Sequence, residues 1–181
     1  MSSVEFLIST LFGLYLMVVL LRLWLQLAQA DFYNPFSQFI VKATHPLVGP
    51  MRRVLPSVGR FDTATLVLAF LVAVLKIMAV GLAVHGVIYT NILAIIIQAG
   101  LNVLSEAFQL VFYVLIIRVI LSWVSQGQNP LEYVFHQLTE PFLAPIRRII
   151  PPMGGLDLSV MFAIIGLLFL QKLMSDLLGI F

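Results

Sequence analysis

The stretch "NPFSQFIVKATHPLVGPMRRVLPSVGRFD" occupies residues 34–62, and it returns as "NPLEYVFHQLTEPFLAPIRRIIPPMGGLD" at residues 129–157. Ten of the 29 aligned positions are identical without a gap, and four of those ten are prolines. Two polar, proline-rich segments in the same register indicate an internal duplication. The chain therefore contains one structural unit twice.

The sequence around these segments is too apolar for a soluble protein. Of its 181 residues 61% are hydrophobic and 10% are charged, whereas soluble domains have about 45–50% and about 25%. A bilayer core of about 30 Å is crossed by roughly 20 apolar helical residues. The predicted spans are residues 4–28, 63–84, 103–123 and 158–178. The sequence predicts an all-α membrane protein with four transmembrane helices.

The duplication sets the domain boundaries. The first repeat covers residues 1–84 with a polar insert at 34–58, and the second covers 103–181 with an insert at 129–152. Residues 85–102 are either a lengthened start of the third helix or an outer-side, re-entrant connector. Each insert carries apolar residues at helical spacing, which predicts a short amphipathic helix at the membrane surface. Each repeat is thus a helix, an amphipathic insert and a second helix.

The matched prolines and polar residues predict where these helices begin and end. Pro46 and Pro141 are expected to end the insert helix or to begin the next piece. A second short element should follow, with a kink or break at Pro50 and Pro145, because an interior proline removes a backbone hydrogen bond. Side chains that accept hydrogen bonds from free amides cap helices. The predicted helix caps are Asn34, Asp62, Asn129 and Asp157.

Basic residues orient the chain, because cytoplasmic loops are enriched in lysine and arginine. The basic residues of the inserts are Lys42, Arg52, Arg53 and Arg60 in the first and Arg147 and Arg148 in the second. Residues 77–117 contain neither lysine nor arginine. Both inserts are therefore predicted to face the cytoplasm, with both termini on the outer side of the membrane. The two units are then parallel repeats.

The arginine pairs are the first candidate site. Arg52 and Arg53 recur as Arg147 and Arg148 in copies that otherwise differ at most positions. Paired guanidinium groups at a membrane surface suit phosphate, whether of a lipid headgroup or of a nucleotide, so a specific phosphate or partner site is one interpretation. Simple anchoring on the cytoplasmic side is the alternative interpretation.

Charged residues inside the spans are a second set of candidates, because they are costly in hydrocarbon. They are Arg22, Lys76, Glu106, Arg118 and Lys172. Arg22 and Arg118 lie near the ends of their helices, so extension of the side chain toward the headgroups accounts for both. Lys76 and Lys172 either extend outward in the same way or line a polar path. Glu106 is a candidate counter-charge for either lysine.

The sequence shows no motif for catalysis or cofactor binding. It has no cysteine, and its three histidines do not share a helical face at ligand spacing. There is no glycine-rich phosphate loop, zinc motif or nucleophile elbow. A net charge of +2 is too small to suggest nucleic acid. We therefore predict a protein that is not an enzyme, with no metal and no cofactor.

The second copy carries the more specific family pattern. Its motifs are Arg118-Val-Ile-Leu-Ser-Trp123, Asn129-Pro130, Thr139-Glu-Pro141, Pro145-Ile-Arg147-Arg148 and Gly154-Gly-Leu-Asp157. They resemble the YggT (YlmG-type) family of integral membrane proteins of bacteria and plastids. The first copy, with Asn34-Pro-Phe-Ser-Gln38 and Pro50-Met-Arg-Arg53, resembles the two-repeat proteobacterial form. It departs from the usual Ser-Trp at Leu25-Gln26-Leu27 and from a second glycine at Arg60.

The resemblance implies involvement in envelope or division-associated processes or in osmotic and ion tolerance. In plastids it implies assembly of b-type cytochrome haem and nucleoid distribution. It supplies no catalytic residue. The favoured hypothesis is a non-enzymatic assembly or scaffolding factor of the bacterial inner membrane, with both termini in the periplasm. Its inserts would contact lipid phosphate, a membrane-protein partner or a second copy of the chain. The alternative is a small ion or solute transport component that uses Lys76 and Lys172.

Overall fold

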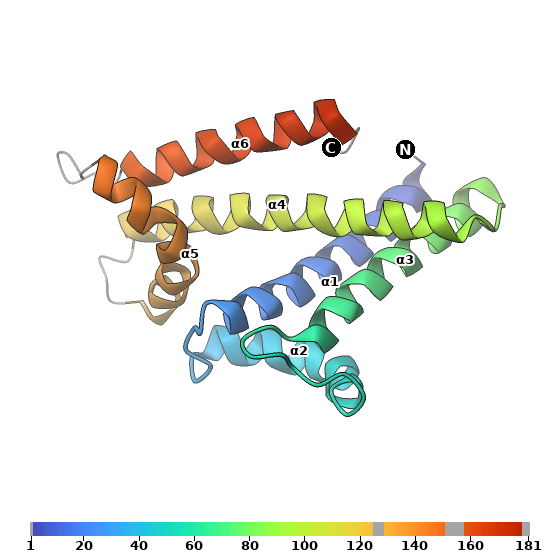
Figure 1. Cartoon of the computed structure of the whole chain (residues 1–181), viewed down its shortest axis with the longest axis horizontal. Helices are drawn as coiled ribbons and strands as arrows, with labels where there is room; N and C mark the ends of the chain where they lie inside the picture. The colour runs from blue at the N-terminus through green and yellow to red at the C-terminus, as the bar shows by residue number, and fades with distance from the viewer. Residues whose placement is uncertain (1, 125–128, 151–157, 179–181) are drawn as a thin grey trace. The chain divides into compact units, whose positions relative to one another are not determined.

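The computed structural model describes residues 2–124, 129–150 and 158–178, and these residues form helices without a β-strand. Figure 1 shows their order along the chain. The helices are α1 (Ser3–Leu27), α2 (Pro35–Met51), α3 (Thr63–His85), α4 (Ile92–Val124), α5 (Pro130–Ile149) and α6 (Leu158–Leu178). Four of them, α1, α3, α4 and α6, are long and apolar enough to cross a membrane. The predicted all-α membrane fold is confirmed.

Helix α4 is longer than the predicted third span. It runs without interruption for 33 residues, or about 50 Å at about 1.5 Å per residue. Because a bilayer core is about 30 Å thick, such a helix has to tilt or to extend beyond the core. Residues 92–102 are thus a lengthened start of α4, and residues 86–91 alone link it to α3. Gly86, in the left-handed conformation at φ 64°, ends α3.

The insert helices do not end where the prolines predicted. Helix α2 continues through Pro46 and Pro50, and α5 continues through Pro141 and Pro145. The expected helix end or new start at Pro46 and Pro141 is therefore wrong, because each helix is continuous there. All four prolines are exposed, and a spacing of four residues puts each pair on one face of its helix. The carbonyl groups that lose their donors thus lie on an accessible side, so the helix tolerates the loss.

The chain divides into two compact units, and α1, α2 and α4 contribute residues to both. The first unit is Met1–Leu23 with Phe39–Ala107, and the second is Trp24–Gln38 with Phe108–Phe181. Apolar side chains form the core of the first unit. Its most deeply buried members include Leu16 and Val19 of α1, Val48 of α2, and Ala69 and Ala73 of α3.

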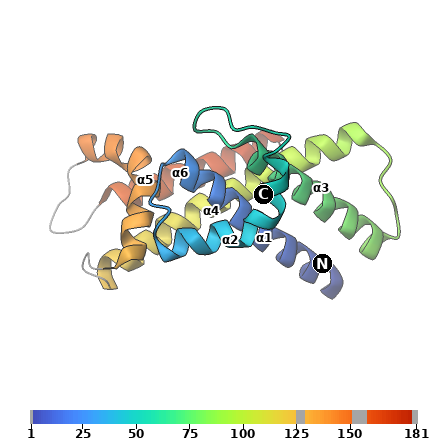
Figure 2. The ribbon, with the colours of Figure 1, turned by 90° about the horizontal axis from the view of Figure 1, so that it is seen from below.

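The core of the second unit joins three helices. Leu115 of α4, Leu143 of α5 and Val160 of α6 are buried against one another. Figures 1 and 2 show α5 lying across the ends of α4 and α6. The second insert is therefore attached by apolar packing to both transmembrane helices of its own repeat.

Candidate functional site

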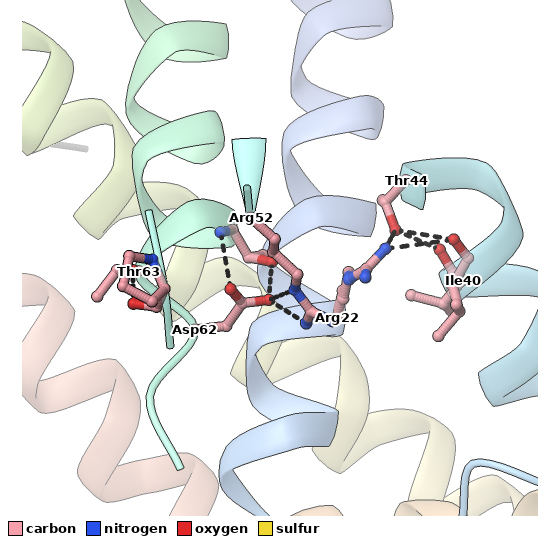
Figure 3. Close-up of polar contacts among 9 residues, drawn as sticks. Arg22, Ile40, Thr44, Arg52, Asp62 and Thr63 are labelled. Carbon is pink, nitrogen blue, oxygen red and sulfur yellow. Dashed lines mark hydrogen bonds and ion pairs between the residues drawn. The ribbon is translucent and has the colours of Figure 1, made fainter. Parts of the chain in front are cut away.

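A buried arginine of α1 holds the first insert. The Arg22 side chain is 3% exposed, and its Nη1 donates to the hydroxyl of Thr44 at 2.7 Å and to the carbonyl of Val41 at 3.3 Å. Figure 3 shows the guanidinium group pointing from α1 to Thr44 on α2. Thr44 in turn donates to the carbonyl of Ile40 at 2.7 Å, one turn earlier on α2.

The second repeat builds the same contact. Arg118 of α4 is 9% exposed and donates to the hydroxyl of Thr139. Thr139 donates to the carbonyl of Phe135 at 2.7 Å, as Thr44 does to that of Ile40. We call this repeated arrangement the Arg–Thr contact; it consists of Arg22 with Thr44 and of Arg118 with Thr139.

The Arg–Thr contact corrects the sequence interpretation of both arginines. Their guanidinium groups do not extend to the surface but are buried against the insert of their own repeat. Sequence reasoning gave the two threonines no role, although Thr44 and Thr139 are identical between the copies. A buried arginine needs a hydrogen-bond acceptor. The threonine that is identical in the two copies was the feature of the sequence that could have identified this acceptor.

Removing the hydroxyl of the Arg–Thr contact should destabilise the protein. We expect Thr44→Val and Thr139→Val each to lower the free energy of unfolding by about 1.5–3 kcal/mol, because each removes a buried hydrogen bond to a charged group. Valine has nearly the shape of threonine, so packing changes little. Unfolding in mixed micelles measures the loss. Thr44→Ser and Thr139→Ser keep the hydroxyl and should lower the free energy of unfolding clearly less. If the serine and valine variants were destabilised equally, the assigned contact would be wrong.

Asp62 forms the centre of the first repeat's polar site. Its carboxylate is fully buried, caps α3 through the amide of Thr65 at 3.4 Å, and accepts from the Thr65 hydroxyl at 2.5 Å. Arg52 donates to the same carboxylate from Nε at 3.2 Å and from Nη2 at 2.5 Å. Figure 3 shows Arg52 and Asp62 facing each other. The predicted cap is present, with an arginine partner that spacing did not predict.

The surroundings of Asp62 decide its protonation. Burial raises the pKa of the Asp62 carboxyl, but hydrogen bonds from Arg52 and Thr65 and the charge of Arg52 outweigh burial. They hold the pKa below the ordinary value of 3.8. The carboxylate is therefore charged at neutral pH and binds the guanidinium group as an ion pair.

The two arginines of each pair have different surroundings. Arg52 is bound to Asp62, and its counterpart Arg147 is bound to Glu140 at 3.1 Å. Arg53 and Arg148 are exposed, and the part of the chain that the structure describes gives neither side chain a hydrogen bond or ion pair. The first arginine of each pair thus stabilises the insert, and the second remains accessible.

The two candidate lysines also differ. Lys76 of α3 pairs with Glu106 of α4 at 3.1 Å, with side chains 15% and 11% exposed. Gly13 of α1 borders this pair, since a Cβ there would lie 3.2 Å from Glu106 Oε1. Lys172 pairs instead with Asp176 on its own helix at 2.7 Å and is 73% exposed. Lys76 and Lys172, which follow the two inserts at positions 96 residues apart, thus lie in unlike environments.

Two further predicted caps, Asn34 and Asn129, begin the insert helices, and Asn34 also connects the two inserts. Asn34 accepts from the amide of Phe36 at 3.0 Å, and Asn129 accepts from that of Leu131 at 2.9 Å. The Asn34 side-chain amide also donates to the carbonyl of Pro130 at 2.7 Å, so the start of α2 contacts the start of α5. Asp157 lies outside the described residues.

Further contacts in the second unit reinforce this connection. The amide of Asp31 donates to Gln137 Oε1 at 2.9 Å. The rings of Phe36 and Phe135 lie 5.5 Å apart between centroids, so α2 and α5 also meet through aromatic packing. The beginning of the first insert is thus fastened to the second insert.

Within the described ranges no group of three His, Cys, Asp or Glu residues is placed to hold a metal ion.

Comparison with known proteins places the chain in a family. The CCB3/YggT family model matches residues 1–83 and 90–178. A Vibrio alginolyticus protein encoded in the proC 3′ region is 57% identical over 179 residues, covering 99% of this chain and 97% of that protein. The protein YggT of Escherichia coli strain K12 is 47% identical over 166 residues, covering 91% and 85%.

A third relative, from Haemophilus influenzae, is 41% identical over 180 residues, covering 99% of this chain and 95% of that protein. The names of these relatives state no activity. No solved structure is significantly similar. The family match extends across both repeats, with their buried Arg–Thr contacts and connected inserts, and the chain therefore belongs to the CCB3/YggT family.

Proposed function

We propose that the protein is a non-enzymatic assembly or scaffolding factor of the bacterial inner membrane, acting in envelope, division or osmotic-tolerance processes. Its two inserts face the cytoplasm and present Arg53 and Arg148 to anionic groups, either lipid phosphates or a membrane-protein partner. The observation that carries the proposal is that the two arginines of each pair have different surroundings. In each repeat one arginine is bound to a carboxylate, and the adjacent one is exposed.

The attachment of the inserts supports this role. The Arg–Thr contact joins each insert to the transmembrane helix that precedes it, and Asn34 joins the first insert to the second. Held in this way, Arg53 and Arg148 lose less conformational entropy when they bind an anion than they would on flexible loops. Exposed apolar side chains on the inserts, such as Phe39 and Phe142, suit contact with the lipid boundary.

The lysines do not favour the transport alternative. A path that uses Lys76 and Lys172 as equivalent groups would give them similar partners and burial. Instead, Lys76 is enclosed with Glu106, whereas Lys172 is exposed beside Asp176. The interpretation of Lys76 as part of an interhelical ion pair needs no transported ion.

Photo-crosslinking in living cells tests the proposed docking role. A photoreactive residue at Val54, which is 80% exposed and adjacent to Arg53, should capture lipid or a protein partner. We expect Arg53→Gln with Arg148→Gln to reduce the captured product at least about fivefold, because two exposed charge contacts are lost. Lys42→Gln with Arg60→Gln removes the same charge and is the matched control. If the product persists in the inserted Arg53/Arg148 variant, the docking role is wrong.

Cysteine labelling tests the proposed orientation. The chain has no cysteine, so Arg53→Cys and Arg148→Cys each introduce a single thiol at an exposed position. Both should react with a membrane-impermeant maleimide in inside-out vesicles and not in intact spheroplasts, because both inserts are basic. Labelling from opposite sides would exclude the parallel-repeat topology, and labelling of both in spheroplasts would reverse the orientation.

A further inference from the structure

The second unit contains a cleft of about 610 Å³ between α4, α5 and α6. Its polar lining side chains are Arg118, Ser122, Glu132, His136 and Arg147. Its apolar lining includes Val119 of α4 and Met161, Ile164 and Ile165 of α6. The polar groups come from the insert helix and the adjoining end of α4, whereas most of the apolar wall belongs to two membrane-crossing helices.

The polar groups of the cleft converge on one carboxylate. Glu140 lies 3.6 Å from Arg118, 3.3 Å from His136 and 3.1 Å from Arg147. Its Oε2 atom is buried and accepts no hydrogen bond among the described residues. Arg118 and Arg147, both paired with Glu140, therefore line the cleft together with Glu132.

The cleft has both polar and apolar lining, and these match the two parts of an amphiphile. An acyl chain suits the apolar wall at Met161, Ile164 and Ile165, while a phosphate suits guanidinium groups held in place by a carboxylate. Positive and negative side chains both line the cleft, so a purely anionic headgroup would bring negative charge near the Glu132 carboxylate. A headgroup that carries phosphate and ammonium together is complementary to both.

We propose that this cleft binds one zwitterionic phospholipid of the phosphoethanolamine type. Its phosphate lies at Arg118 and Arg147, its ammonium group lies at Glu132, and one acyl chain follows α6 past Ile164. The site is distinct from Arg53 and from Arg148, neither of which lines the cleft. It goes beyond the proposed docking role, because a lipid bound here is part of the folded second unit.

Native mass spectrometry of the full chain in detergent tests the site. The lipids are phosphatidylethanolamine, phosphatidylglycerol and diacylglycerol with identical acyl chains. We expect one phosphatidylethanolamine molecule to be retained at least about fivefold more strongly than phosphatidylglycerol, because only the former has an ammonium group for a carboxylate. Diacylglycerol, which lacks phosphate, should not be retained. Equal retention of all three lipids, or preference for phosphatidylglycerol, would overturn the assignment.

Two variants separate the parts of the site. Glu132→Gln should abolish the preference for phosphatidylethanolamine over phosphatidylglycerol. Ile165→Trp places a larger side chain in the apolar part of the cleft, at a position that is 55% exposed. It should weaken the binding of both phospholipids at least about tenfold, because it displaces two or more methylene groups of the acyl chain. Leu170→Trp, on the same helix but outside the cleft lining, is its control and should change neither.

Circular dichroism and size-exclusion chromatography confirm that each variant is folded. If folded Ile165→Trp binds phosphatidylethanolamine as the wild type does, the cleft is not the site. If folded Glu132→Gln keeps the lipid preference, the ammonium group does not bind there. Arg53→Gln with Arg148→Gln should leave the preference for phosphatidylethanolamine over phosphatidylglycerol unchanged, because neither arginine lines the cleft. Failure of the docking role and failure of the lipid site are therefore separate results.

Discussion

Glu106→Leu should lower the free energy of unfolding by about 3–5 kcal/mol, because it leaves Lys76 charged and without its partner among membrane-crossing helices. The pair joins α3 to α4 with both side chains largely buried. Breaking one member of a buried ion pair is more damaging than removing both, since a lone charge keeps the full desolvation penalty.

The double variant Lys76→Met with Glu106→Leu supplies the decisive comparison. Replacing both members with apolar side chains of similar size should restore most of the lost stability, because two packed apolar groups need no compensation. The measurement is denaturant-induced unfolding in mixed micelles, followed by circular dichroism. Gln98→Leu, at an exposed position of α4, is the control and should change stability by no more than about 0.5 kcal/mol. A double variant no more stable than Glu106→Leu would contradict the ion-pair assignment.

Asp62→Ala should lower the free energy of unfolding by about 2–4 kcal/mol. The substitution removes a helix cap, which contributes about 1 kcal/mol, and hydrogen bonds to a buried carboxylate, which contribute about 1.5–3 kcal/mol. Arg52 is 38% exposed and regains water when its partner is lost, so the ion pair adds little more. Asp62→Asn keeps the cap and should lose about half as much.

The same unfolding measurement provides a pH test. Because the pKa of Asp62 is lowered in the folded protein, its stabilising contribution is fully present above pH 3.8 and is lost as the pH falls through the lowered value. Asp62→Asn should lack this part of the acid dependence. Asp176→Asn alters an exposed pair on α6 and should change stability by less than about 0.5 kcal/mol. An acid profile of Asp62→Asn identical to that of the wild type would refute the assigned ion pair.

Local features of the sequence predicted the elements of this fold well. Apolar composition and run length predicted the four membrane-crossing helices, because the thickness of a bilayer sets their length. Asn-Pro at positions 34 and 129 and Asp62 marked helix starts that the structure contains. Capping depends on residues within one helical turn, so it is visible in sequence.

The prolines and the third span show where such local rules stop. A proline was expected to end each insert helix, yet α2 passes Pro46 and α5 passes Pro141. The cost of a proline depends on what the freed carbonyl faces, which is a property of the folded protein. Similarly, polar residues between 92 and 102 did not interrupt α4, because isolated polar side chains leave the backbone hydrogen bonds of a helix intact.

By itself, then, the sequence determined a duplicated, membrane-crossing helical unit and the positions of its caps, since these follow from composition, spacing and nearest neighbours. Tertiary structure alone decided which charged side chains form hydrogen bonds and ion pairs within the protein. Arg22 binds Thr44, and Arg52 is paired with Asp62 whereas Arg53 is exposed. Lys76 is buried with Glu106, whereas Lys172 is exposed. The reason is physical: a side chain's partner is set by which helices become neighbours, and identical residues in two repeats acquire different neighbours once the chain is packed.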